Sequence, residues 1–234
     1  MRKFIFDVDG TLTPSRQPMN PQFKEWFLDF MKREKVWIVT GSDYEKTVEQ
    51  LGSDICVDVV KCYNCSGNDH WFKGKRVSSS EFSAPKDLYD IMYGWLQVSK
   101  FPHRTGNHIE ERRGCINFSV VGRNADDIER KEYVKYDLLN RERETIAYQI
   151  NTTFNDITAT VGGETGIDIH RTGADKRQIL EDFEYDDEII FFGDRMEPGG
   201  NDFPLASTLK YQYPKGFSHA VKDWEHTWQI LKEY

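Results

Sequence analysis

The sequence has little of three things that would decide its class at once. Its 234 residues include only four cysteines, too few for a disulfide scaffold. Basic residues do not predominate, since 31 Lys and Arg against 39 Asp and Glu give a formal net charge of −8, which argues against a general binder of nucleic acid or anionic membranes. No apolar run approaches the roughly 18 to 20 residues that span a bilayer. We therefore expect a soluble, cytoplasmic protein with reduced thiols and with neither nucleic acid nor membrane as a partner.

One apolar stretch near the N-terminus nevertheless contains two charges. It reads FIFDVDGTLT and carries Asp7 and Asp9 where a buried strand would run. Strand interiors disfavour Asp, and an ionised carboxylate taken out of water needs a cation or several hydrogen bonds. The stretch therefore predicts that something is bound at this strand.

Strand and helix patterns alternate in the first and last parts of the chain. Apolar residues recur at helical spacing in FKEWFLDFMKRE, a second apolar strand reads VWIVTG, and DYEKTVEQL resumes a helical pattern. Near the C-terminus, EIIFFGD again joins an apolar strand to a carboxylate, Asp194. Such alternation predicts an α/β fold with a doubly wound, Rossmann-like parallel sheet, whose ligand site lies beyond the carboxyl ends of the strands. Asp7, Asp9 and Asp194 would then converge.

The middle of the chain has a different pattern. A helix over 87–99 is followed by alternating segments at 115–121 and 157–161, with a charged helix near 124–140 between them. This order predicts an α+β insertion in the α/β core. The expected boundaries of the two core parts and of the inserted domain are 1–83, 171–234 and 84–170.

Four aspartates form the expected metal site. Asp7, Asp9, Asp194 and Asp202 offer oxygen ligands of the kind that Mg²⁺ prefers. Helix capping and turn formation are the alternative, but capping would not need two acids at the spacing of Asp7 and Asp9. We therefore expect Mg²⁺ as a cofactor.

Phosphoryl transfer is the chemistry that these acids would support. Asp7 would attack phosphorus, and Asp9, on the same face of an extended chain, would protonate the leaving oxygen. Thr40 and Gly41, which follow the second strand, would supply hydroxyl and N–H donors to the phosphate. Lys176 would add a positive charge; an isolated lysine is more often exposed to solvent, but this one shortly precedes the second acid-bearing strand.

These motifs resemble those of haloacid dehalogenase (HAD) superfamily phosphotransferases. The shared signatures are Asp-x-Asp-Gly-Thr, a Thr or Ser after the second strand, a Lys, and Gly-Asp followed by further acids. The resemblance narrows to the eukaryotic-type α-phosphomannomutases, of cap subclass IIB, in DVDGTLTPSRQ, VTGSDYEKTVEQLG, GRNADDIER and FFGDRMEPGGND, and it extends over nearly the whole chain. It implies a core domain with the metal and the nucleophile, and an inserted cap domain that closes over a sugar phosphate.

The resemblance also implies substrate contacts. In such mutases the cap arginines hold the phosphate that is not reacting, and an acid of the cap contacts sugar hydroxyls. The matching positions are Arg112, Arg123 and Arg130 for the arginines and Asp168 for the acid, and Arg16 matches the arginine after the first loop. Guanidinium groups suit a phosphate because their fork matches its oxygens. Arg123 and Arg130 are seven residues apart and would share one face if a helix joined them, although a solvated helix surface would show the same charges.

Several stretches depart from the family pattern. Gly166 stands where the mutases usually have a serine two residues before the sugar-contacting acid. The usual FPDGW-like passage is HRTGA, and the usual GDKTMPGGND is GDRMEPGGND. These changes bear on hexose specificity more than on phosphoryl transfer. In the loop KCYNCSGNDHW, Cys62, Cys65 and His70 would supply only part of a zinc site, so we expect turn or buried thiols there.

The sequence as a whole predicts a Mg²⁺-dependent phosphohexomutase. It would interconvert mannose 6-phosphate and mannose 1-phosphate through an aspartyl phosphate on Asp7, with hexose 1,6-bisphosphate as intermediate and activator and with glucose phosphates as alternative substrates. A sugar-phosphate phosphatase with the same nucleophile is the alternative, because water intercepts the phosphoenzyme if the cap excludes it poorly. A non-catalytic sugar-phosphate binder is a third hypothesis, against which the intact Asp7 and Asp9 argue. The resemblance also suggests a homodimer formed through the caps, to which Tyr93 and Trp95 would contribute an apolar face.

Overall fold

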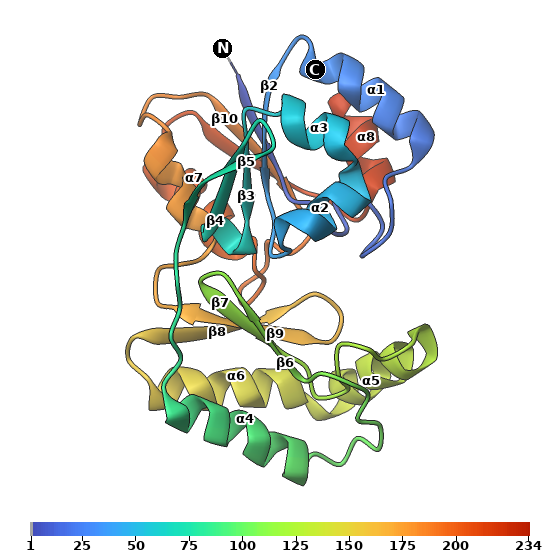
Figure 1. The fold of residues 1–234 in the computed structure, drawn as a ribbon. Helices are drawn as coiled ribbons and strands as arrows, with labels where there is room; N and C mark the ends of the chain where they lie inside the picture. The colour runs from blue at the N-terminus through green and yellow to red at the C-terminus, as the bar shows by residue number, and fades with distance from the viewer. Residues whose placement is uncertain (1) are drawn as a thin grey trace. The chain divides into compact units, whose positions relative to one another are not determined.

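A computed structural model describes residues 2–234, which form two compact units with separate hydrophobic cores (Figure 1). The first, here called the core unit, combines the chain up to Ser80 with the segment Ala174–Tyr234. The second, here called the cap unit, is the continuous segment Glu81–Gly173. The insertion expected at 84–170 lies within the cap unit.

A seven-stranded sheet forms the centre of the core unit. The elements of this unit are, in chain order, β1 (Lys3–Phe6), α1 (Pro21–Met31), β2 (Lys35–Val39), α2 (Tyr44–Leu51), α3 (Ser53–Asp58), β3 (Lys61–Asn64), the 3-10 helix η1 (Cys65–Gly67), β4 (Asp69–Phe72), β5 (Lys75–Ser79), the 3-10 helix η2 (Lys176–Asp182), β10 (Ile189–Gly193), α7 (Phe203–Gln212), β11 (Gly216–Ala220) and α8 (Trp224–Leu231). The strand order is β11-β10-β1-β2-β3-β4-β5, parallel from β11 to β3 and antiparallel at β4 and β5. This mostly parallel sheet with helices packed on both faces confirms the predicted α/β class.

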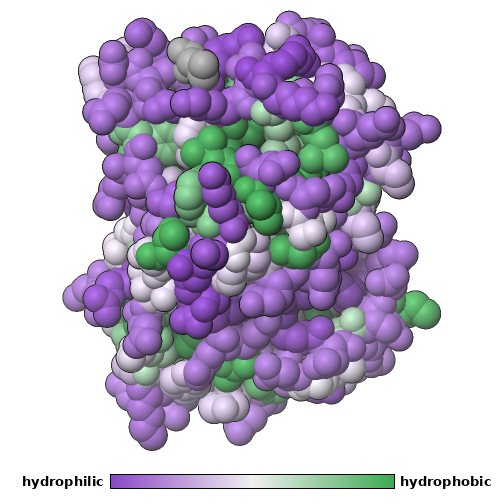
Figure 2. All heavy atoms as spheres, turned by 45° about the horizontal axis from the view of Figure 1, so that its top comes forward, coloured by the Kyte–Doolittle hydropathy of each residue, from purple (hydrophilic) through white to green (hydrophobic). Residues whose placement is uncertain are grey.

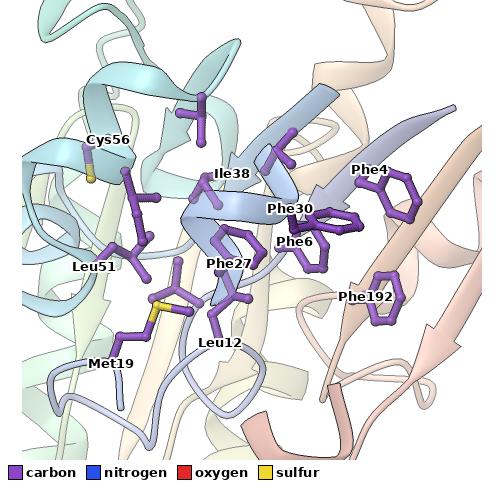
Figure 3. Close-up of a cluster of buried hydrophobic side chains, with 14 of the residues drawn as sticks. Phe4, Phe6, Leu12, Met19, Phe27, Phe30, Ile38, Leu51, Cys56 and Phe192 are labelled. Carbon is purple, nitrogen blue, oxygen red and sulfur yellow. The ribbon is translucent and has the colours of Figure 1, made fainter. Parts of the chain in front are cut away.

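Alternate residues of the strands enter two different apolar clusters. Phe4 and Phe6 of β1 belong to the cluster that includes α1, α2, α3 and α8, whereas Ile5 belongs to the cluster that includes η2 and α7. Figure 3 shows part of the first cluster, in which the ring of Phe6 lies 4.9 Å from that of Phe192 and 5.3 Å from that of Phe27 between centroids. Because apolar side chains fill both faces of the sheet, the ends of the strands are left for polar groups.

The first helix illustrates how the local sequence produces this packing. α1 buries Phe23, Phe27 and Phe30, whose spacing of four and three residues places them on one face. Asn20 caps its start, since the side-chain oxygen accepts hydrogen bonds from the backbone N–H groups of Gln22 and Phe23. The helix therefore begins directly after the loop that follows β1 and covers that strand.

The cap unit packs helices on a four-stranded antiparallel sheet with the order β6-β7-β9-β8. Its elements are α4 (Lys86–Val98), β6 (Ile109–Arg112), β7 (Cys115–Phe118), α5 (Asp127–Asn140), α6 (Glu142–Thr153), β8 (Ile157–Gly162) and β9 (Gly166–Arg171). Leu88, Phe118 and Ile146, from a helix, a strand and another helix, are fully buried in its apolar cluster. The cap unit is thus an α+β fold with its own core.

The charged helix expected near 124–140 begins later than the sequence pattern indicated. Asp126 and Glu129 form a capping box, in which each side chain accepts a hydrogen bond from the backbone N–H of the other residue. The helix therefore starts at Asp127, which leaves Arg123 in the preceding turn and Arg130 on α5. Arg123 and Arg130 therefore do not share a helix face, because no helix joins them. Neither α6 nor β9 was expected from the sequence pattern.

The surface is polar, as the composition indicates. Figure 2 shows a face on which hydrophilic residues predominate, while apolar residues gather mainly in the upper middle of the view. Every helix within residues 2–234 falls short of the length and apolarity that crossing a bilayer requires. The four cysteines are free and buried.

Candidate active site

Neighbouring strands place the acids of the core unit together. β1 lies between β10 and β2, in a register that aligns Phe6 with Phe192 on one side. Asp7 follows Phe6 directly, and its backbone N–H donates a hydrogen bond of 3.0 Å to the carbonyl of Phe192. Asp194 follows the last residue of β10. Because parallel strands end at the same edge of the sheet, Asp7 and Asp194 meet there.

A tight turn after β1 brings the backbone close to Asp194. The carbonyl of Val8 accepts hydrogen bonds from the N–H groups of the residues at positions 11, 12 and 13, at 3.2, 2.9 and 3.1 Å. Gly10 has a φ of +77°, and a Cβ at this position would lie 2.5 Å from Oδ2 of Asp194. Both the backbone conformation and the neighbouring carboxylate therefore require glycine at position 10.

A buried lysine joins two of the acids. Lys176 begins η2 and is fully buried. Its Nζ donates hydrogen bonds to Oδ1 of Asp7 at 2.5 Å and to Oδ1 of Asp202 at 2.7 Å. Oδ2 of Asp202 accepts a further hydrogen bond of 3.1 Å from the backbone N–H of Arg195. Asp7, Lys176 and Asp202 therefore hold one another in fixed positions inside the core unit.

Burial and repulsion shift the pKa values of these groups. Burial, with the charges of Asp202 and Asp194, raises the pKa of Asp7 well above its ordinary value in spite of Lys176. Burial and the Asp202 charge raise the pKa of Asp194 to about 6. Burial acts to lower the pKa of Lys176, but the Asp202 and Asp7 charges outweigh it and raise that pKa. The cluster is thus short of positive charge even with a protonated lysine inside it.

The three carboxylates suit a divalent metal ion. One oxygen from each of Asp7, Asp194 and Asp202 lies within 4.8 Å of the others, and residues 2–234 contain no other group of three or more such side chains placed to hold a metal. Three ionised carboxylates beside one ammonium leave two negative charges in excess, which is the charge that one divalent cation balances. Carboxylate oxygens are also the hard ligands that Mg²⁺ prefers. The residues therefore fit the expected cofactor.

Asp9, the fourth expected ligand, faces other partners. Its Oδ1 accepts hydrogen bonds from the backbone N–H of Arg16 at 2.6 Å and from Nε2 of Gln50 at 3.0 Å. Its Oδ2 accepts a longer one of 3.5 Å from Oγ of Ser42. Gln50, on α2, also donates to Oγ1 of Thr13 at 3.1 Å. The Asp9 carboxylate is therefore held by the loop after β1 and by α2, and stands outside the three-carboxylate group.

The expected phosphate donors follow the neighbouring strand. Thr40 comes directly after β2, and its buried Oγ1 accepts a hydrogen bond of 3.1 Å from the backbone N–H of Ser42. Gly41, between them, is half-buried. Arg16 has a φ of +61°, a left-handed conformation that non-glycine residues adopt rarely. Thr40 and Gly41 thus stand at the end of β2 as Asp7 stands at the end of β1.

The cap unit contains a second cluster of charges. Nη2 of Arg112 and Nε of Arg123 lie 2.8 and 2.6 Å from the same oxygen of Glu110 on β6. Burial would raise the pKa of Glu110, but the two guanidinium groups lower it. Burial likewise acts to lower the pKa of Arg112, and the charges of Asp168 and Glu110 raise it. Two of the three expected cap arginines therefore meet around one carboxylate.

Arg130, the third cap arginine, contacts the loop between β8 and β9. Its Nη2 donates a hydrogen bond of 2.8 Å to Oε2 of Glu164, and its Nη1 a longer one of 3.4 Å to Oγ1 of Thr165. The side chain of Arg130 is 9% exposed, whereas that of Glu164 is 49% exposed. A buried guanidinium group is thus paired with a half-exposed carboxylate.

Asp168 on β9 faces Asn117 on β7. The two residues are register partners, and Nδ2 of Asn117 donates a hydrogen bond of 2.6 Å to Oδ1 of Asp168. A Cβ at Gly166 would lie 2.7 Å from Nδ2 of Asn117 and 3.1 Å from its Oδ1. The room that a serine at position 166 would need is therefore taken by the Asn117 amide.

Four residues at these two clusters were not expected from the sequence: Gln50, Glu110, Asn117 and Glu164. A signal existed for Glu110, because it precedes Arg112 by two residues on a strand, and residues at that spacing share a face. The other contacts depend on which elements pack together. Sequence spacing does not contain that information.

The loop with Cys62, Cys65 and His70 does not form a metal site. None of these residues belongs to a metal-binding group within residues 2–234. The Cys62 thiol donates instead to the carbonyl of Cys56 at 3.7 Å, and Nε2 of His70 lies 2.9 Å from the carbonyl of Gly67. These thiols and the imidazole take part in local packing.

Solved structures with a similar fold include a nucleotidase and a phosphatase. An N-terminally truncated, IMP-bound IMP-nucleotidase from Plasmodium falciparum superposes with a TM-score of 0.67 at 17% identity, over 99% of this chain and 67% of that chain. The C-terminal domain of trehalose-6-phosphate phosphatase from C. albicans gives a TM-score of 0.62 at 17% identity, over 95% and 80% of the two chains. At such identities the likeness concerns the fold.

Relatives found by sequence share more with this chain than the fold. A phosphomannomutase from Drosophila melanogaster is 33% identical over 242 residues, covering 98% of this chain and 93% of the relative. One from Arabidopsis thaliana is 31% identical over 225 residues, covering 93% and 89%. The model of the eukaryotic phosphomannomutase family matches residues 23–234. The chain therefore belongs to the eukaryotic phosphomannomutase family.

Proposed function

We propose that this protein is a phosphohexomutase that interconverts mannose 6-phosphate and mannose 1-phosphate. The observation that carries the proposal is the buried Asp7, hydrogen-bonded to Lys176 beside Asp194 and Asp202, in a chain of this family. A carboxylate in such a position is oriented before a substrate arrives. Pre-orientation of the reacting group is what phosphoryl transfer chiefly asks of a protein.

Asp7 is the nucleophile of the proposed reaction. Lys176 holds its Oδ1 at 2.5 Å, while the contact of Oδ2 with Oγ1 of Thr11 is long, at 3.4 Å. We therefore assign the attack on phosphorus to Oδ2. The bond between phosphorus and the sugar oxygen breaks as the bond to Asp7 forms, which leaves an aspartyl phosphate.

Asp9 is the proposed acid and base. It gives a proton to the sugar oxygen when Asp7 takes a phosphoryl group, and removes one from a sugar hydroxyl when Asp7 returns the group. Two donors fix its Oδ1, which leaves Oδ2 for the proton. Transfer from Asp7 to mannose 1-phosphate makes hexose 1,6-bisphosphate, and transfer of the other phosphoryl group back to Asp7 makes mannose 6-phosphate. The bisphosphate also phosphorylates an idle enzyme, so it is the proposed activator.

Mg²⁺ is the proposed cofactor, held by Asp7, Asp194 and Asp202. When bound, the ion would supply positive charge that offsets the carboxylates and the charge of the transferring phosphoryl group. The excess of two negative charges and the raised pKa values of Asp7 and Asp194 support this assignment. Asp9, with its separate partners, is assigned to proton transfer.

The remaining candidate residues bind substrate in this proposal. Arg112, Arg123 and Arg130 of the cap unit take the phosphate that is not reacting, and the carboxylates that they contact stand where phosphate oxygens would bind. Asp168 takes sugar hydroxyls. The core unit contributes donors to the reacting phosphate from Arg16, Thr40 and Gly41.

Phosphorus NMR tests the proposal. The protein is mixed with Mg²⁺, mannose 1-phosphate and a trace of hexose 1,6-bisphosphate, and the signals of mannose 6-phosphate and inorganic phosphate are followed together. We expect mannose 6-phosphate to predominate and its formation to depend on the bisphosphate. Inorganic phosphate as the main product would contradict the mutase assignment.

A sugar-phosphate phosphatase with the same nucleophile is the second candidate. Two observations favour it: Gly166 provides no hydroxyl beside Asp168, and Arg130 is already paired with Glu164. A cap that holds the second phosphate weakly would release the bisphosphate and admit water to the phosphoenzyme. The same NMR experiment distinguishes the two functions.

We also propose a homodimer formed through the cap. Tyr93 on α4 is 55% exposed, and a second copy of this helix would cover it. Trp95, the other residue expected at this face, is instead half-buried: it packs against the apolar cluster of the cap unit, and its Nε1 donates a hydrogen bond of 2.7 Å to Oε1 of Gln149. Light scattering on wild type and on Tyr93→Glu tests this proposal. A monomeric wild type would contradict it.

A further inference from the structure

Carboxylates already pair with the three candidate arginines of the cap unit. Arg112 and Arg123 share Glu110, Arg130 pairs with Glu164, and Asp168 acts on Arg112. Each of the three arginines therefore already contacts a carboxylate. A phosphate dianion that binds one of these arginines competes with the carboxylate beside it, so that carboxylate must give way.

Glu164 differs from Glu110 in its partners and its exposure. Glu110 contacts two guanidinium groups and its side chain is 31% exposed. Glu164 is 49% exposed, and among residues 2–234 its one ion-pair partner is Arg130. An ion pair with one exposed member contributes little to stability, because water replaces the lost contact. Glu164 is therefore the carboxylate that leaves at the lowest cost.

The backbone around Glu164 is anchored while its side chain is exposed. Arg143 on α6 donates hydrogen bonds from Nη1 to the carbonyls of Gly163 and Gly166, at 3.2 and 3.4 Å. Its guanidinium group is fixed in turn by Asp137, at 2.7 Å. The loop on both sides of Glu164 is thus held in place, and a change of side-chain rotamer is enough to release Arg130.

We propose that Glu164 is a displaceable counter-anion that occupies Arg130 until a phosphate monoester takes its place, and that it thereby sets the phosphate affinity of the cap unit. The inference rests on the phosphate-binding role proposed above for Arg130. A carboxylate and a phosphate present similar pairs of oxygens to a guanidinium group, but the phosphate dianion has the greater charge. Glu164 therefore weakens the binding of every anion at Arg130, and it favours the binding of dianions over that of monoanions.

Equilibrium binding in the Asp7→Asn background tests this inference, because the probes are not turned over there. Inorganic phosphate and mannose 1-phosphate are titrated calorimetrically without a divalent cation, so that the core carboxylates repel anions. Removing an exposed competing carboxylate is expected to tighten both probes about 5-fold in Glu164→Gln. Glu144, also about half exposed and paired with an arginine, Arg141, gives the matched control Glu144→Gln, which should change neither probe.

The outcomes separate this inference from the proposed function. Unchanged or weaker phosphate binding in Glu164→Gln overturns the inference, as does a gain that persists when Arg130→Ala is added. Failure of every variant to bind phosphate overturns it as well. Tighter inorganic phosphate with no binding of mannose 1-phosphate would support the role of Glu164 and contradict the proposed substrate. Turnover of mannose 1-phosphate by wild type, with unchanged affinities in Glu164→Gln, would support the proposed substrate and contradict the role of Glu164.

Discussion

The core unit and the cap unit both pair opposite charges, but they bury these pairs to different depths. In the core unit Lys176 and Asp202 are 0% exposed and Asp7 is 5% exposed. In the cap unit Arg130 is 9% exposed and its partner Glu164 is 49% exposed. A buried pair fixes geometry, whereas a half-exposed pair exchanges partners easily. This difference supports the roles proposed above, phosphoryl transfer for the buried core cluster and phosphate binding for the half-exposed pair of Arg130 and Glu164.

The largest expected effect comes from Asp7, the proposed nucleophile. Asp7→Asn should lower turnover by about 1,000-fold or more, since the amide cannot form the phosphoenzyme. It should leave the binding of phosphate by the cap unit unchanged. Turnover of mannose 1-phosphate, measured beside calorimetric binding, checks both statements. Asp58→Asn, at an exposed acid on α3, is the control and should keep full activity.

A lysine variant of the core unit and an arginine variant of the cap unit test directly whether the two ion pairs differ in burial. Lys176→Met leaves two buried carboxylates without their ammonium partner and should lower the free energy of unfolding by about 3–5 kcal/mol. Arg130→Met removes a pair with a half-exposed partner and should cost about 1 kcal/mol or less. Urea unfolding followed by circular dichroism gives both values. Equal costs would refute the contrast between the two units.

The response to Mg²⁺ should depend on pH in the core unit. Without a cation the pKa of Asp194 is raised to about 6, above the ordinary value of 3.8. The native state then binds more protons than the unfolded state between these values, so its stability falls as the pH rises from about 4 through 6. At about pH 7 Asp194 is ionised and can bind a cation directly. At about pH 5 it is protonated, so Mg²⁺ must displace a proton in order to bind. Saturating Mg²⁺ should therefore raise the melting temperature by a few degrees more at the higher pH.

Thermal unfolding at both pH values, with and without Mg²⁺, measures this difference. Asp194→Asn removes the titrating group and should abolish most of it. A Mg²⁺ shift that is the same at both pH values in wild type would argue against Asp194 as a ligand.

A modest effect is expected in the cap sheet. Gly166→Ser would place a Cβ 2.7 Å from Nδ2 of Asn117, and relief of that contact should cost about 1–2 kcal/mol. Adding Asn117→Ala should recover part of this cost, so a double-mutant cycle measures the coupling. Gly94→Ser is the matched control, because a Cβ at Gly94 meets nothing within 4 Å. Equal stabilities of the two serine variants would show that the cap sheet adjusts freely.

The core cluster was largely predictable from the sequence for a physical reason. An acid directly after an apolar strand is unusual and draws attention to Asp7 and Asp194. Because parallel strands end at the same edge of a sheet, the sequence alone predicted that these two residues lie close together. The orientation of Asp9 was not predictable, because the turn after Val8 takes it off the extended path of β1. Gln50, its partner, is one polar residue among several on α2.

The cap cluster was predictable only in part. The arginines were found by resemblance, and Glu110 had a signal in its spacing from Arg112. The contacts of Asp168 and of Arg130 depend on the register of β7 and β9 and on the β8–β9 loop. The start of α5 had a readable signal in the capping box of Asp126 and Glu129. α6 had a weak one, since its buried apolar residues are limited to Ile146, Ala147 and Ile150 among charged and polar neighbours.

The pairing of β1 with β10 has a consequence for the order in which the protein matures. Lys3 aligns with Lys35 of β2 on one side and with Ile189 of β10 on the other, so the second side of the first strand must wait for a partner that is synthesised 186 positions later. All of the cap unit, Glu81–Gly173, emerges before that partner and has its own apolar cluster. Closing a loop of this length is slow compared with folding a contiguous segment. We therefore expect the cap unit of the nascent chain to fold first, and Asp7 to contact Lys176 and Asp202 among the last events of folding.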